Sequence, residues 1–284
     1  MSRLFDLICE HLKTNGRPVY SVALSTDGNV ESATITPGNR GQNIYSVAKA
    51  FTVTAAGIAF DRGLLKLEDR VTDILADEIP DGIDPRWHNI TPRDAMLHRM
   101  GLPSGFLDID VAPAGAFGED YLGYMMRYPF AADPCVERCY TDGAFYLMSR
   151  VVEKVCGEPI DSLLWREFFL PAGFAEAAWS RCPQGHPMGA TGLYISTVDM
   201  LKLGELYRLG GVYGGIRILS EKWVSTVLEE GFELRKTGIG SSYGKGGMLG
   251  QRLVVFPDKK ITVAWEGYRY RETSEILEII EEFK

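Results

Sequence analysis

Strand-like segments occur near both ends of the chain, and the region between them is a series of helical segments interrupted by proline. Residues 19–25 and 30–36 are predicted to form a hairpin, and residues 251–256 and 260–265 a second one. The middle region is broken by Pro80, Pro85, Pro92, Pro103, Pro113 and Pro129. This order predicts that both chain ends build one antiparallel sheet and that the helical middle is inserted as a lobe.

The predicted fold is therefore of the mixed α/β (α+β) class, with the sheet flanked by helices at residues 2–14 and 273–283. We assign residues 1–60 and 186–284 to the α/β sheet lobe. Residues 61–185 form the helical lobe of the same integrated domain. A cleft between two such lobes is a usual place for a functional site.

The stretch Tyr45-Ser46-Val47-Ala48-Lys49-Ala50-Phe51 lies where the sheet region passes into the helical region. It opens an Ala-rich apolar run that predicts a buried helix, with Ser46 in its first turn. Ser46 and Lys49 are three residues apart and would share one helix face. A lysine there can take the proton of a serine hydroxyl and make it a nucleophile. The alternative is an ordinary helix start, because Ser-x-x-Lys is common by chance.

Composition and charge exclude several other functions. A net charge of −8 provides no basic surface for nucleic acid, and no apolar run reaches the ~18 residues of a membrane span. The amphipathic N-terminus lacks the apolar segment of a signal peptide, so we expect a cytoplasmic protein. The five cysteines are an odd number and predict reduced thiols. Cys135 and Cys139 lack a second ligand pair nearby, so we expect no metal site.

Four further segments, taken in order with Ser46-Val47-Ala48-Lys49, resemble the serine β-lactamase and penicillin-binding-protein superfamily, and most closely its class C β-lactamase-like branch. These segments are residues 61–69, 90–103, 190–200 and 243–251. The resemblance covers roughly residues 20–265. It implies a β-lactamase/transpeptidase-like fold and a catalytic serine at Ser46 with Lys49 as its base. His98 matches a family position that is mainly structural.

The resemblance places the second family motif, Tyr-x-Asn, at Tyr140-Thr141-Asp142. Tyr140 would share the role of base with Lys49 and pass a proton to the leaving group. Asp142 departs from the motif, because an ionised carboxylate cannot donate a hydrogen bond to a substrate carbonyl. Asp142 is expected instead to pair with Lys49, which would raise the pKa of that lysine and weaken it as a base.

The third family motif, Lys-Thr-Gly on a strand beside the serine, has two candidate positions. Lys236-Thr237-Gly238 matches by letter, whereas Lys245-Gly246-Gly247 matches by context, since it leads directly into the C-terminal hairpin. We prefer the second. Lys245 would then supply positive charge near the serine, and Gly246 would lack the threonine hydroxyl that helps β-lactamases hold a carboxylate. The N–H groups of Ser46 and Met248 would form the oxyanion hole.

The resemblance thus predicts a serine hydrolase that acts through an acyl-enzyme on a small ester or amide, with esters preferred. Its chemistry requires neither a metal nor an organic cofactor, and its partner is a small-molecule substrate. Two alternatives remain open. One is a β-lactamase or D-amino-acid peptidase, and the other is a non-catalytic member of the fold that only binds a ligand, which Asp142 and Gly246 motivate.

Overall fold

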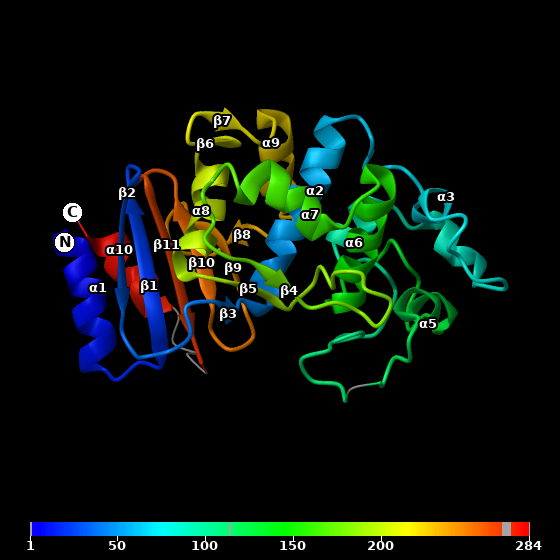
Figure 1. Ribbon diagram of the computed structural model, residues 1–284, viewed down its shortest axis with the longest axis horizontal. Helices are drawn as coiled ribbons and strands as arrows, with labels where there is room; N and C mark the ends of the chain where they lie inside the picture. The colour runs from blue at the N-terminus through cyan, green and yellow to red at the C-terminus, as the bar shows by residue number, and fades with distance from the viewer. Residues whose placement is uncertain (1, 114, 269–273, 284) are drawn as a thin grey trace. The chain divides into compact units, whose positions relative to one another are not determined.

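The computed structural model describes residues 2–113, 115–268 and 274–283 of the chain (Figure 1). Its internal contacts divide the chain into two compact units. The sheet unit comprises Met1–Val47, Phe169–Ala178 and Leu193–Lys284, and the helical unit comprises Ala48–Phe168 and Trp179–Gly192. The helix that follows Ser46 therefore groups with the helical unit, whereas the sequence placed it with the sheet. Its all-round apolar surface is the physical reason, since such a helix must be buried on every side, and its main packing partners are other helices of that unit.

The sheet unit is built around a six-stranded sheet with the order β2-β1-β11-β10-β9-β8. All its neighbouring strands pair antiparallel, and Val22 of β1 lies opposite Trp265 of β11. The prediction that both chain ends share one antiparallel sheet is confirmed. Its strands are β1 (Val19–Thr26), β2 (Asn29–Thr34), β8 (Arg235–Lys236), β9 (Tyr243–Gly246), β10 (Arg252–Phe256) and β11 (Ile261–Gly267).

Helices cover both faces of this sheet (Figure 1). α1 (Arg3–Thr14) and α10 (Ser274–Glu282) lie on one face, where apolar side chains of α1 at Leu4, Ile8 and Leu12 pack with those of β1, β10 and β11. α8 (Thr197–Arg208) lies on the other face, and Gly204 permits its close approach, because a Cβ there would lie 2.6 Å from Thr262. The predicted start of the last helix, Thr273, lies outside the described residues.

The remaining elements of the sheet unit are short. α9 (Glu221–Glu230) begins after the cap residue Ser220, whose hydroxyl accepts from the N–H of Trp223. β3 (Gln42–Asn43) pairs with β5 (Leu193–Ile195), and β6 (Val212–Tyr213) pairs with β7 (Ile216–Arg217). In β4 (Ala178–Trp179), Ala178 belongs to the sheet unit and Trp179 to the helical unit.

The helical unit is organised around α2 (Ala48–Asp61) and α6 (Asp142–Cys156), which pack against each other. α2 is buried from Ala48 to Ala59, and it is terminated just beyond Asp61 by Gly63, which has the left-handed backbone (φ +70) typical of a helix cap. The shorter helices are α3 (Val71–Ile74), the 3-10 helix Pro85–Asn89, α4 (Pro92–Met96), α5 (Tyr121–Arg127), α7 (Ile160–Leu164) and the π-helix Trp165–Phe169. The predicted helical middle region is confirmed.

Within the described part of the chain, no helix combines the length and the apolar character that crossing a membrane requires.

Candidate active site

Ser46 lies in a 3-10 turn, Tyr45–Val47, rather than in the first turn of an α-helix as the sequence predicted. α2 begins two residues later, at Ala48. The approach to the turn explains the difference. Tyr45 has a left-handed backbone (φ +48), and its N–H donates to the side-chain oxygen of Asn43 at 2.8 Å. The chain therefore bends sharply before the serine and passes through a tighter turn into the helix.

The strand that carries the third motif, β9, lies beside this serine turn within the sheet unit. Lys245 and Gly246 belong to β9, and Gly247 follows it. A Cβ on Gly247 would lie 2.8 Å from the carbonyl oxygen of Ile44, so only glycine permits this approach. Lys236 lies instead on β8, the exposed outer strand. The position preferred by context is thus the one next to Ser46.

Lys245 forms an ion pair with Glu233, an acid that sequence analysis missed. Glu233 is 2% exposed and has a left-handed backbone (φ +62), so it sits in an irregular turn that no periodic pattern predicts. The carboxylate compensates the ammonium charge of Lys245. This lysine therefore attracts an anionic substrate less strongly than an uncompensated one would.

Met248 lies in the turn after β9, which is closed by a hydrogen bond from the N–H of Gly250 to the carbonyl of Gly247 at 3.1 Å. The side chain of Gln251 holds the same turn by accepting from the N–H of Leu249 at 3.2 Å. Among the described residues, the N–H of Met248 has no acceptor. A held backbone with an open N–H is what an oxyanion-hole donor requires.

In the helical unit, Lys49 is fully buried and its ammonium group has defined partners. Nζ donates to Oδ1 of Asp142 at 2.7 Å and to the carbonyl of Ala190 at 3.0 Å. The expected pairing of Lys49 with Asp142 is confirmed. A buried carboxylate at this distance favours the charged form of the lysine.

Tyr140 lies over Lys49, with the ring centroid 4.8 Å from Nζ. His98 packs against the same ring, its own ring centroid 4.4 Å from that of Tyr140. Nδ1 of His98 accepts from the N–H of Thr141 at 3.3 Å, and His98 is fully buried. His98 therefore fixes the start of α6 and the ring of Tyr140, which agrees with the structural role expected for it.

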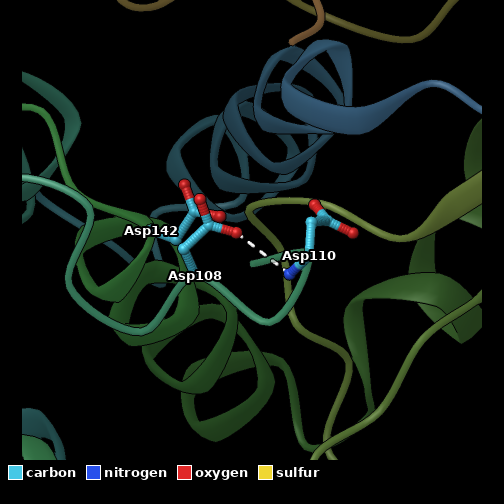
Figure 2. Close-up of side chains that lie close together, drawn as sticks. All are labelled: Asp108, Asp110 and Asp142. Carbon is cyan, nitrogen blue, oxygen red and sulfur yellow. Dashed lines mark hydrogen bonds between the residues drawn. The ribbon is translucent and has the colours of Figure 1, made fainter. Parts of the chain in front are cut away.

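Asp142 also belongs to a cluster with Asp108 and Asp110, two acids that sequence analysis missed. One oxygen from each carboxyl lies within 4.8 Å of the others, and Figure 2 shows the carboxyl groups of Asp108 and Asp142 side by side. The N–H of Asp110 donates to Asp108 at 2.9 Å. Burial, followed by the charge of Asp142, raises the pKa of Asp108. The Asp108-Ile109-Asp110 repeat was visible in the sequence, but nothing local placed it beside Lys49.

This cluster is the group of described side chains whose geometry could hold a cation, rather than Cys135 and Cys139. Each carboxyl already has a donor of its own: Lys49 for Asp142, the backbone for Asp108, and the hydroxyl of Thr191 for Asp110. The ammonium group of Lys49 supplies the positive charge that a metal ion would otherwise provide. The arrangement fits a charged-lysine site better than a metal centre.

Comparisons with known proteins identify the family and the fold of the chain. The family model described as Beta-lactamase matches residues 4–265, and no curated protein matches the chain. Among solved structures, a penicillin-binding protein homologue from Caulobacter crescentus has a TM-score of 0.73 at 14% identity, covering 93% of this chain and 91% of that one.

Two other structures show the same fold. A hydrolase with promiscuous acyltransferase activity (EstCE1) has a TM-score of 0.73 at 16% identity and covers 97% of both chains. A class C β-lactamase in complex with cefoxitin has a TM-score of 0.69 at 15% identity, covering 99% of this chain and 98% of that one. With the family model matching nearly its whole length, the chain belongs to the β-lactamase family and has the β-lactamase/transpeptidase-like fold.

Proposed function

We propose that the protein is a serine hydrolase that cleaves a small ester or amide through an acyl-enzyme on Ser46. The observation that carries the proposal is the environment of Lys49, which follows Ser46 by three residues of continuous helical backbone and is held by Asp142 and Ala190. These two contacts position the amine of Lys49 one helical turn from Ser46, where its uncharged fraction can accept the proton of the serine hydroxyl.

The other residues have roles that follow from their chemistry. The phenol hydroxyl of Tyr140 would pass the proton to the leaving group, and the contact of its ring with Nζ of Lys49 keeps the tyrosine beside that lysine. The N–H groups of Ser46 and Met248 would stabilise the negative charge of the tetrahedral intermediate. Water then releases the acyl group. Membership of a family of hydrolases supports this reaction class.

Charge favours an ester over a β-lactam substrate. Glu233 compensates Lys245, Gly246 offers no hydroxyl, and the Asp108–Asp110–Asp142 cluster adds negative charge around Lys49. Penicillins carry a carboxylate, which these groups bind poorly or repel. A neutral ester carries no carboxylate and is not repelled.

A second candidate function is ligand binding without catalysis. Its support is the 2.7 Å contact between Lys49 and Asp142, because a carboxylate so close holds the lysine in the charged form that cannot act as a base. Such a protein would bind a carbonyl compound and leave it intact.

One experiment separates these functions. The protein, its Ser46→Ala variant and a matched Ser241→Ala control are exposed to a fluorophosphonate and separately to a penicillin, and intact masses are measured. We expect a fluorophosphonate adduct on wild type and on the control only, with little or no penicillin adduct. A stable penicillin adduct or its turnover would favour the β-lactamase or peptidase alternative. If folded wild type forms no adduct with either reagent, Ser46 is not a nucleophile and the binding function stands.

A further inference from the structure

A row of polar residues crosses the α8-facing side of the sheet, in the sheet unit and outside the proposed hydrolytic machinery. The strand register places Thr34 of β2 opposite Ser21 of β1, and Ser21 opposite Glu266 of β11. The hydroxyl of Ser21 contacts that of Thr197 in the first turn of α8, which shows the face on which the row lies.

Glu266 is the unusual member of this row. It is fully buried, and its Oε1 atom has no hydrogen-bond partner among the described residues. Its other oxygen, Oε2, lies 3.4 Å from the hydroxyl of Ser21, so the carboxyl group points along the row toward β1. A buried polar atom without a partner is costly, and each such case in a folded protein requires an explanation.

A pocket of about 610 Å³ begins where this row ends. It lies over β1 and β2 and beside the first turn of α8, and the loop at residues 36–40 closes one side. Its lining is rich in hydroxyl groups, from Ser21, Ser32, Thr34, Thr36, Ser196 and Thr197. Ser21 and Thr197 therefore separate Glu266 from the space of the pocket.

The pocket carries one uncompensated positive charge. Arg40 lines it and forms no ion pair with any described residue, whereas Lys202 donates to Asp199 at 2.7 Å and cancels that acid. The N–H of Asp199 is capped by Ser196. The N–H groups of Thr197 and Val198 have no acceptor within the described chain, and they stand at the positive end of a twelve-residue helix.

We propose that this pocket binds a small hydroxyl-bearing anion, such as a sugar phosphate or a sugar acid. Arg40 and the first turn of α8 bind its phosphate or carboxylate, and the hydroxyl row of Ser21, Thr34 and Thr197 binds its hydroxyl groups. The site is distinct from Ser46 and does not depend on the proposed hydrolysis.

Glu266 gives the site a pH dependence with a definite sign. Burial raises the pKa of Glu266 to about 8, so its carboxyl is neutral at lower pH and does not repel an anion. Within the described ranges, the charged groups facing it are Asp199 and its partner Lys202 on α8. β1 contributes only the hydroxyl of Ser21, and Gln251, before β10, is uncharged. Anion affinity should therefore fall as pH rises through about 8.

Isothermal titration calorimetry on the full chain tests the site, with D-glucose 6-phosphate, D-gluconate and uncharged D-glucose as probes. At about pH 6.5 we expect at least one anion to bind and glucose to bind at least ~10-fold more weakly. Arg40→Ala should weaken anion binding by about tenfold, while the exposed control Arg3→Ala leaves it unchanged. Phosphate and carboxylate are distinguished by which of the two anions binds better.

The pH series supplies the second test. Wild-type affinity should fall several-fold between about pH 6.5 and about pH 9, and the isosteric Glu266→Gln variant should show no such fall. The proposal is overturned if folded protein binds neither anion at about 10 mM, or if glucose binds equally well. Binding that is indifferent to Arg40→Ala, or a pH dependence that persists in Glu266→Gln, would also overturn it.

Discussion

At position 142 an aspartate stands where the family motif has asparagine, and its carboxylate is in direct contact with Lys49. An asparagine would donate to a substrate carbonyl and leave the lysine amine without a counter-ion. Asp142 instead accepts from Lys49 at 2.7 Å and lies beside two more carboxyl groups, those of Asp108 and Asp110. When ionised, the carboxylate accepts a hydrogen bond from the lysine and cannot donate one to a substrate carbonyl.

We expect Asp142→Asn to change substrate preference without abolishing acylation of Ser46. Removing the carboxylate releases Lys49 as a base and restores a hydrogen-bond donor, so acylation by activated esters should become faster, by roughly tenfold for each pKa unit by which Lys49 is lowered. The acylation rate should rise more for amide substrates than for esters. Stopped-flow acylation rates on an ester and amide series measure this, with the exposed loop variant Asp258→Asn as control. Rates unchanged on every substrate would remove Asp142 from the site.

At the scale of elements, β9 links the sheet to the serine turn. Its motif, Lys245-Gly246-Gly247, was located from the neighbouring sequence and not from an exact match to Lys-Thr-Gly. The two hairpins were also predictable, because short turns between strand-like segments follow a local rule that neighbouring residues satisfy. Asp108, Asp110 and Glu233 were not. They come from irregular loops, and their partners are distant in sequence, so no periodicity signals them.

The backbone of β9 packs closely against β10 at Gly244, and a substitution there tests whether this contact is required. A Cβ at this position would lie 2.1 Å from the carbonyl oxygen of Leu253 on β10, a backbone atom that cannot move without breaking the ladder. We expect Gly244→Ala to lower the free energy of unfolding by about 3 kcal/mol and to slow acylation. Gly214→Ala lies in a turn with open space but a left-handed backbone, and it should lower the free energy of unfolding by only about 1 kcal/mol. Urea denaturation measures the free energy of unfolding of both variants. An equal loss in the two would show that β9 can shift to accommodate the added methyl group.

For the whole molecule, buried carboxyl groups of the sheet unit set opposite limits on the stable pH range. Burial alone would raise the pKa of Glu205, but hydrogen bonds from Arg208 and Thr262 bring it below its ordinary value. Its stabilising contribution is present above the unfolded-state pKa and is lost as pH falls through the folded value. Glu266 acts in the opposite direction, because burial raises its pKa and no basic group among the described residues compensates it.

Glu266 should therefore make the folded protein less stable as pH rises. Below pH 4.5 both the folded and unfolded forms hold this proton. Between 4.5 and about 8 the unfolded form releases it first, so the free energy of unfolding falls by an amount on the order of 4 kcal/mol. Above about 8 the loss is complete.

Glu266→Gln, which cannot ionise, should gain stability over wild type as pH rises, whereas the exposed control Glu229→Gln should follow wild type. Chemical denaturation at several pH values measures the difference. A constant gap between wild type and Glu266→Gln at every pH would show that Glu266 does not titrate in this range, and the unpaired carboxyl oxygen would then need another explanation.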